Sequence, residues 1–251
     1  MKRTHLSLFS GIGGLDLAAE WAGFETVGQC EWADYPTKVL EKHWPDVPSW
    51  RDIRSLTKES FHERTGLRTV DVISGGFPCQ PFSVAGKRRG SEDDRYLWPE
   101  MLRVIDELRP AWVVGENVEN AVRMVAGEIM YSLEKIGYCG QIYIISAYCS
   151  GAWFNGKRMV IVAASNNRST SLRRNIQFST DEKTCTERDY YRGGTPKFDL
   201  RERWLLESRP YGVAHEIPHR VDRLRSLGNA VVPQQFYPIF QAIVEVERKS
   251  L

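Results

Sequence analysis

Short apolar runs rich in β-branched residues alternate with helical patterns over the first 165 or so residues. Strands that alternate with helices predict βαβ units and a largely parallel sheet. Ligands of such sheets bind beyond the carboxyl ends of the strands, so the residues that follow each strand are the candidates for a site. The expected strands are Leu6–Phe9, Thr26–Cys30, Val70–Ser74, Trp112–Gly115, Gln141–Ala147 and Met159–Ala163, and the expected helices are Leu15–Ala22, Tyr35–His43, Leu97–Leu108 and Ala121–Ile136.

The composition fits a globular α/β chain. Its 251 residues are 42% hydrophobic and 26% charged, which allows a sizeable core and excludes a disordered or fibrous chain. The net charge of +2 neither indicates nor excludes a nucleic-acid partner. Five scattered cysteines without a close C-x-x-C pair argue against a disulfide scaffold or zinc ribbon and favour reduced thiols in a cytoplasmic protein. We expect no metal site, no membrane-spanning helix and no signal peptide.

The alternating pattern is lost between residues 166 and 220, which are polar and rich in Ser, Thr, Asn and Arg. From Asn166 to Arg225 the chain holds 13 Lys and Arg against 9 Asp and Glu, a local charge of +4. A basic segment with several aromatic residues could contact phosphates and bases, although a solvated, partly ordered insertion has the same composition. Beyond it, Leu224–Val246 is expected to form a turn at Gly228–Asn229 and then a closing helix.

A glycine-rich loop, Phe9–Gly14, directly follows the first expected strand. Its form is G-x-G-G and not the G-x-G-x-x-G of dinucleotide enzymes, so a pyrophosphate site is poorly supported. Glu31 ends the second strand and could accept hydrogen bonds from both ribose hydroxyls, while Trp32 offers an apolar surface for an adenine ring. Asp52 could bind the adenine amino group. Together these residues favour a site for a nucleoside without phosphates over a glycine turn with surface residues.

A second loop, Gly75–Ser83, is rich in Gly and Pro and contains Cys79. A cysteine in such a loop can act as a nucleophile when its thiolate is favoured, whereas the other four cysteines are expected to be small buried hydrophobes. The glycine-flanked basic segment Ala85–Gly90 suits a mobile loop that touches phosphates. Glu116 ends the next strand, where it would face the same crevice as Cys79 or, alternatively, cap the following helix.

Together these residues closely resemble the cytosine-5 DNA methyltransferases. The compact C-terminal end is similar to that of bacterial and phage members. The resemblance implies a Rossmann-like methyltransferase core at residues 1–165, a small target-recognition region at 166–220, and a segment at 221–251 that returns to pack beside the first strand. The matching blocks run in the family's order and are Phe9–Gly14, Glu31-Trp32, Asp52-Ile53, Pro78-Cys79-Gln80, Glu116-Asn117-Val118, Arg158 and Gly228–Val231.

The resemblance also implies the ligands. The methyl donor would be S-adenosylmethionine, and the target would be double-stranded DNA, methylated by a monomer of a restriction-modification system. Residues at positions that hold the donor in the family are Phe9, Gly11, Gly13, Glu31, Trp32, Asp52, Ile53, Pro78, Leu97, Asn229 and Ala230.

The implied chemistry begins when Cys79 attacks carbon 6 of a cytosine flipped out of the duplex. Glu116 would hold or protonate N3, so that carbon 5 takes the methyl group, loses its proton to a base and releases Cys79. Arg158 would contact O2 or an adjacent phosphate. Candidates for gripping the DNA are Gln80, Ser83, Lys87, Arg88, Arg89 and Lys157.

Two features depart from the family's pattern. Gly156 stands where the family usually has the first of two arginines, and the neighbouring Lys157 could supply the phosphate contact only as a point charge. The stretch between Arg158 and Asn229 is short, so it can read only a short site or read it loosely.

Three alternatives remain open. A tRNA cytosine-5 methyltransferase shares the same core, and a DNA-binding regulator without turnover would explain the altered stretch before Arg158. A flavin or NAD oxidoreductase would use Glu31 and the glycines but leaves Cys79 and Gly228-Asn229 without a role.

Overall fold

The computed structural model describes residues 2–78, 96–152, 154–166 and 220–249. Seven strands form one sheet in the order β3-β2-β1-β4-β5-β7-β6. All pairs are parallel except those of β7, which runs antiparallel to β5 and β6. The predicted Rossmann-like, mostly parallel α/β fold is confirmed. The strands are β1 (Arg3–Leu8), β2 (Phe24–Cys30), β3 (Ser49–Trp50), β4 (Val72–Gly76), β5 (Trp112–Val118), β6 (Tyr138–Ile145) and β7 (Arg158–Ser165).

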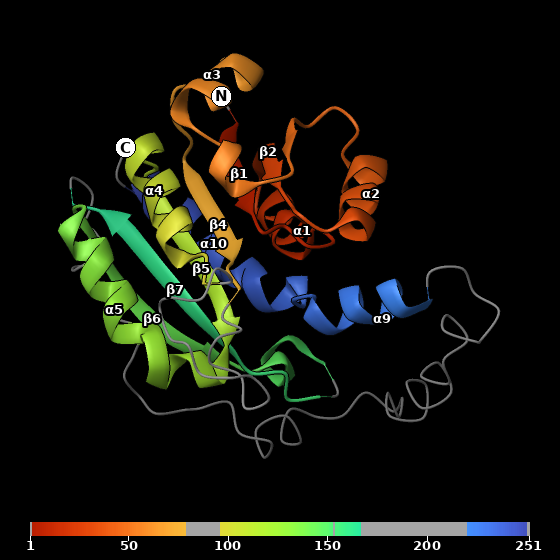
Figure 1. The fold of residues 1–251 in the computed structure, drawn as a ribbon. Coiled ribbons are helices and arrows are strands. Elements are labelled where there is room, and N and C mark those ends of the chain that lie inside the picture. The colour runs from red at the N-terminus through yellow and green to blue at the C-terminus, as the bar shows by residue number, and fades with distance from the viewer. Residues whose placement is uncertain (1, 79–95, 153, 167–219, 250–251) are drawn as a thin grey trace.

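Helices cover both faces of the sheet (Figure 1). The first core cluster joins the sheet to α3, α4 and α5 on one face, and the second joins it to α1 and α10 on the other. In Figure 1, α9 lies to the right of the central strands and below α2, which it contacts. The helices are α1 (Gly14–Trp21), α2 (Asp34–His43), α3 (Lys58–Thr65), α4 (Trp98–Leu108), α5 (Val122–Lys135), α9 (Arg220–Asn229) and α10 (Pro233–Lys249). Among these described helices, none has the length and apolar character needed to cross a bilayer.

Helix α4 shows why these segments are helical. Pro99 occupies its first turn, where a missing backbone N–H costs nothing. Trp98, Met101, Ile105 and Leu108 recur on one face and are buried against the sheet. Helix α10 uses the same principle on the opposite face, where its apolar side pairs with α1.

The structure corrects several of the predicted elements. The strand expected at Gln141–Ala147 was wrong at both ends, since β6 covers Tyr138–Ile145 and Ala147 opens a 3-10 turn. Two helices, α3 and α9, were not expected. The turn predicted at Gly228–Asn229 was wrong, because both residues belong to the end of α9 and the break before α10 lies at residues 230–232. Apart from its two end residues, the region at 166–220 lies outside the described residues.

Gly13 provides a test of how the glycine loop is packed. Its φ is +88°, and a Cβ there would lie 2.5 Å from the Trp44 ring. We expect Gly13→Ala to lower the free energy of unfolding by roughly 1–3 kcal/mol. Gly127 of α5 is the matched control, since a Cβ there meets nothing within 4 Å, and Gly127→Ala should raise stability by about 1 kcal/mol. Denaturant titrations would contradict this packing if both substitutions shifted the midpoint in the same direction.

Candidate functional site

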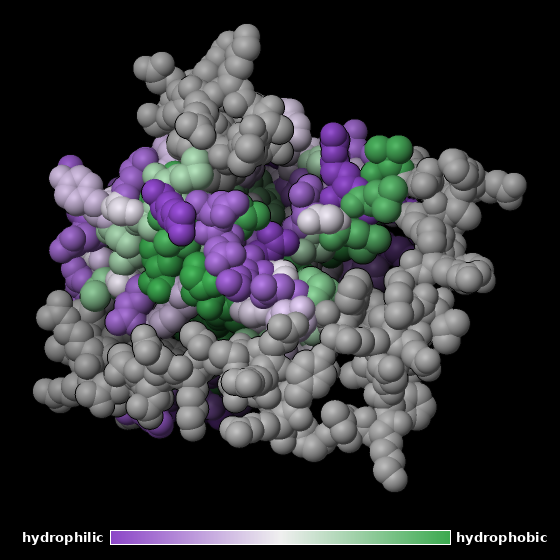
Figure 2. Space-filling view, turned by 90° about the horizontal axis from the view of Figure 1, so that it is seen from below, coloured by the Kyte–Doolittle hydropathy of each residue, from purple (hydrophilic) through white to green (hydrophobic). Residues whose placement is uncertain are grey.

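A crevice of about 1000 Å³ opens beyond the carboxyl ends of β1, β2, β4 and β5. It lies next to β1, which has β2 on one side and β4 on the other, so the strand order reverses there. This is the usual ligand position in open α/β sheets. Figure 2 views the molecule from this end and shows polar and apolar residues side by side. Helix α9 and the chain after it, through Val231, supply a further wall.

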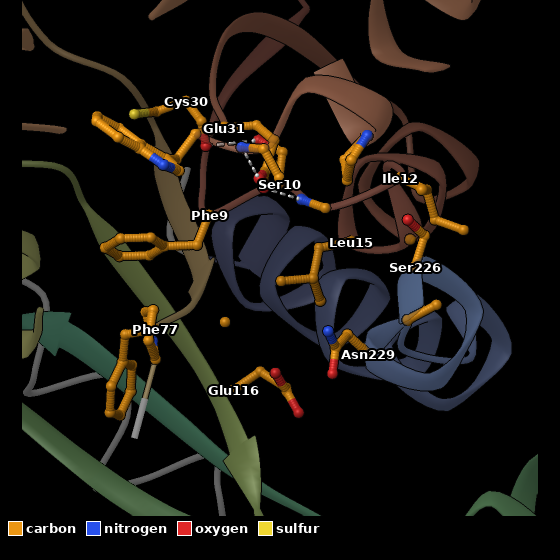
Figure 3. Close-up of a pocket in the computed structure, with 18 of the residues that line it drawn as sticks. Phe9, Ser10, Ile12, Leu15, Cys30, Glu31, Phe77, Glu116, Ser226 and Asn229 are labelled. Carbon is orange, nitrogen blue, oxygen red and sulfur yellow. Dashed lines mark hydrogen bonds between the residues drawn. The ribbon is translucent and has the colours of Figure 1, made fainter. Parts of the chain in front are cut away.

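At one end of the crevice, the Glu31 carboxylate connects the glycine-rich loop after β1 to the chain that follows β2 (Figure 3). One carboxylate oxygen accepts the Gly11 N–H at 2.8 Å and the other accepts the Ala33 N–H at 2.8 Å. Each oxygen keeps a lone pair for a further donor, such as a ribose hydroxyl. A ligand pyrophosphate would compete with Glu31 for the Gly11 N–H and would meet a like charge. The arrangement therefore favours a nucleoside without phosphates over a dinucleotide.

A buried polar cluster lies beneath the glycine-rich loop and holds it in place. Asp16 of α1 is fully buried and accepts hydrogen bonds from the Ser7 hydroxyl of β1 and the Gln29 amide of β2, both at 2.9 Å. Burial raises the Asp16 pKa to about 6, although both hydrogen bonds act in the opposite direction. The cluster ties α1 to the two strands that carry the glycine loop and Glu31.

Apolar and charged side chains together form the walls near Glu31. Trp32 is 71% exposed beside the carboxylate, while Ile53 is buried. Phe9 has a φ of +53°, an uncommon conformation for a residue with a side chain. The Asp52 carboxylate accepts the Arg54 N–H at 2.9 Å and so caps a 3-10 turn. This contact leaves its second oxygen near the Arg54 guanidinium, at 3.7 Å.

Glu116 extends from the end of β5 into the crevice, on the side away from Glu31 in Figure 3. It is only 8% exposed, and burial raises its pKa to about 7, against the opposing effect of the Arg158 charge. The Arg158 Nε lies 3.5 Å from the carboxylate. A Cβ on the paired residue Gly76 would lie 2.6 Å from Glu116 Oε2, so a larger residue there would displace the Glu116 carboxylate. Near neutral pH this carboxyl can both hold and release a proton.

The Asn117 side chain binds the chain that leaves β4. Its side-chain amide donates to the Phe77 carbonyl at 3.0 Å, which fixes the chain just beyond β4. Pro78 follows and lines the crevice. Cys79 is the next residue and lies outside the described residues, as do Gln80, Ser83, Lys87, Arg88 and Arg89.

Arg158 links the sheet to the C-terminal segment. Its guanidinium donates to the Ala230 carbonyl at 3.3 Å, close to its contact with Glu116. Lys157, a predicted DNA contact, does not line the crevice. Its ammonium lies 3.3 Å from the Glu119 carboxylate, and both side chains are exposed.

The structure brings most of the described candidates together. Gly13 is the exception among those expected to hold a cofactor, because it packs on Trp44 below the loop and does not reach the crevice. The candidates that line the crevice are Phe9, Gly11, Glu31, Trp32, Asp52, Ile53, Pro78, Leu97, Glu116, Arg158, Asn229 and Ala230.

Sequence reasoning missed several residues that line the crevice. Tyr35 comes from α2, and Asp222, Arg225 and Ser226 come from α9. The Arg223 guanidinium donates to the Tyr35 hydroxyl at 3.2 Å and so connects the two helices. A polar helix after an irregular region carries no signal of where it docks. Only the helical spacing of Val221, Leu224 and Leu227 could have indicated α9 itself.

Comparison with known protein families identifies the family of this chain. Residues 4–192 match the family model described as C-5 cytosine-specific DNA methylase. This chain belongs to that family. The family relationship places the crevice and its carboxylates in a methyltransferase fold. Within the described residues, no group of three or more His, Cys, Asp or Glu side chains could hold a metal ion.

Named relatives agree with the family. The chain is 36% identical over 152 residues to the Type II methyltransferase M.AquIA of Picosynechococcus, covering 57% of this chain and 61% of that protein. It is 32% identical over 170 residues to M.NgoMIV of Neisseria gonorrhoeae, covering 66% and 53%. The Dnmt2 methyltransferase of S. pombe has a similar fold, with a TM-score of 0.55 at 23% identity, covering 66% of this chain and 51% of the other. The chain thus spans between half and two thirds of these relatives.

Proposed function

We propose that this chain is a DNA (cytosine-5-)-methyltransferase that moves a methyl group from S-adenosylmethionine to carbon 5 of a flipped cytosine. The observation that carries the proposal is the position of Glu116. This buried carboxyl, whose pKa is raised to about 7, shares one crevice with Glu31 and with Pro78, the residue before Cys79. The proposed enzyme acts as a cytoplasmic monomer on a short site in double-stranded DNA.

The crevice fits S-adenosylmethionine, which carries an adenosine without phosphates and a positively charged sulfur. Glu31 would accept the ribose hydroxyls, and Trp32 and Ile53 would contact the adenine. The occupied Gly11 N–H argues against a dinucleotide. When bound, the donor supplies the methyl group. Phe9, Asp52, Leu97, Asn229 and Ala230 would complete its surroundings.

Glu116 and Arg158 would contact different atoms of the cytosine ring. Cys79 would form the bond to carbon 6, and Glu116 would give its proton to N3 as electrons move into the ring. Arg158 keeps part of the Glu116 population ionised, because its positive charge opposes the effect of burial on the Glu116 pKa. The same guanidinium could then donate to O2 of the base. Glu116 is only 8% exposed, so most of its surface is shielded from water.

The proposal is tested by transfer of a tritiated methyl group to duplex DNA and, in parallel, to tRNA. We expect labelling of duplex DNA, and bisulfite sequencing of DNA from expressing cells would then identify the target site. Faster labelling of tRNA would overturn the DNA assignment. Absence of transfer to both, with intact DNA binding, would favour a regulator without turnover.

Cofactor affinity gives a separate prediction for Glu31. We expect Glu31→Ala to weaken S-adenosylmethionine binding roughly 10- to 100-fold, because hydrogen bonds to a charged group contribute about 1.5–3 kcal/mol. Glu25 is exposed on the same strand, so Glu25→Ala is the matched control and should bind as the wild type does. Titration calorimetry without DNA measures both. Equal affinities for the two variants would remove Glu31 from the cofactor site.

A further inference from the structure

Gln235 is a buried polar side chain that neither the sequence analysis nor the proposed mechanism uses. It lies in the first turns of α10 and is 3% exposed. Its side-chain amide donates to two backbone carbonyls, that of Ile145 at 2.7 Å and that of Gly156 at 3.0 Å. One amide group thus uses both of its N–H hydrogens on different segments of the chain.

The two carbonyls mark the two ends of one loop. Ile145 is the last residue of β6, and Gly156 lies two residues before Arg158, the first residue of β7. Within the loop, the Ala147 N–H donates to the Asn155 carbonyl at 2.8 Å. Ile145 and Arg158 are partners in the β6–β7 register. Gln235 therefore clamps the backbone beside the residue that contacts Glu116.

Gly156 makes this clamp possible. Its φ is +40°, and a Cβ there would lie 2.6 Å from the Phe154 ring, so a larger residue would disturb the turn. The family's usual arginine at this position would need a different backbone. In this chain the turn at Gly156 exposes a carbonyl to α10 instead.

We propose that Gln235 is a positioning residue for the proposed methyl transfer: by holding Ile145 and Gly156 it keeps the start of β7, and with it the Arg158 guanidinium, against Glu116. The inference rests on the proposed function for its catalytic meaning. The chain of contacts runs from Gln235 through the β7 backbone to Arg158, and from Arg158 to Glu116 at 3.5 Å and to the Ala230 carbonyl at 3.3 Å.

The proposal predicts a change at Glu116 when the clamp is removed. Among the described residues, β7 faces Glu116 with Arg158, and β4 faces it with Gly76, which has no side chain. Asn229 and Ala230 line the crevice beside it and carry no charge. Burial raises the Glu116 pKa and the Arg158 charge lowers it. If Arg158 is held less firmly, its charge lowers the Glu116 pKa by a smaller amount. The Glu116 carboxyl would then take up its proton at higher pH.

The test compares Gln235→Leu with Gln234→Leu, its exposed neighbour on the same helix. The ¹³C carboxyl signal of Glu116, assigned by its loss in Glu116→Gln, is titrated without DNA or cofactor. We expect the midpoint in Gln235→Leu to rise by roughly 0.5–1 pH unit, since a nearby cation shifts a carboxyl by that order or more. Gln234→Leu should titrate as the wild type does. Single-turnover methyl transfer by Gln235→Leu should fall about tenfold, with S-adenosylmethionine affinity unchanged.

Two results for the Gln235 variants would overturn the proposal. A purely structural role for Gln235 would lower the melting temperature and leave the Glu116 midpoint unchanged. If the leucine variant does not fold, Gln235→Met keeps the unbranched shape and removes both donors, and failure of both to fold would also contradict a positioning role. Absence of transfer by the wild-type protein would count against the proposed function alone, since the titration needs no turnover.

Discussion

Replacing Cys79 by serine is expected to lower methyl transfer to duplex DNA by at least about a thousandfold, because the serine hydroxyl is far less nucleophilic than a thiolate at neutral pH. The binding of S-adenosylmethionine should be unchanged, since Glu31 and the glycine loop hold the other end of the crevice. Single-turnover labelling measures the first effect and titration calorimetry measures the second.

Cys149 provides the control for this substitution. It is an exposed cysteine in the loop between β6 and β7, not the buried hydrophobe expected from the sequence, and it does not line the crevice. Cys149→Ser should transfer methyl groups at the wild-type rate. Labelling by Cys79→Ser that equals that of Cys149→Ser would show that the thiol at position 79 takes no part in the chemistry.

Glu116→Gln should have two opposite effects. Single-turnover transfer should fall at least about tenfold, because glutamine cannot give a proton to the ring. Stability at pH 8 should rise by about 3 kcal/mol, because the wild-type protein must keep a buried charge there that the variant lacks. The exposed Glu119 is the control, and Glu119→Gln should change neither property much.

The direction of the stability effect follows from the pKa of Glu116, which is raised from 4.5 in the unfolded chain to about 7 in the folded protein. Between these values the folded state keeps a proton that the unfolded state has released. Glu116 therefore makes wild-type stability fall as pH rises from 4.5 to 7. The variant lacks this contribution, whereas the similar contribution of buried Asp16 is the same in both proteins. The two proteins should unfold alike near pH 4.5 and differ most above pH 7. If the free energies of unfolding of the two proteins differ by the same amount at pH 4.5 and at pH 8, the pKa of Glu116 is not raised by burial.

The fold could be predicted from the sequence where apolar periodicity and buried faces agree. The helix expected at Leu97–Leu108 corresponds to α4, because its apolar spacing is the spacing that packs on the sheet. The strand expected to end at Gly115 continues through Val118, since Glu116 and Asn117 pair with β7 despite their polar side chains. Pairing between distant strands overrides local polarity, and a single sequence does not reveal which partner is present.

The candidate site was predictable for residues at or next to the ends of strands. Glu31, Glu116 and Arg158 fall at strand ends, and the sheet brings them to one edge. The contribution of α9 was not predictable, because its position depends on where the chain returns after residue 219. Gln235 was equally hidden, since glutamine in a helix gives no sign that its amide will be buried on two distant carbonyls.

The most direct measurement of the central claim is mass spectrometry of the protein after incubation with S-adenosylmethionine and duplex DNA that carries 5-fluorocytosine in the target site. Fluorine at carbon 5 cannot leave as a proton does, so the bond from sulfur to carbon 6 should persist. We predict a covalent protein–DNA species whose modified peptide contains Cys79. Unmodified Cys79 in protein that binds both the DNA and S-adenosylmethionine would contradict the proposed mechanism.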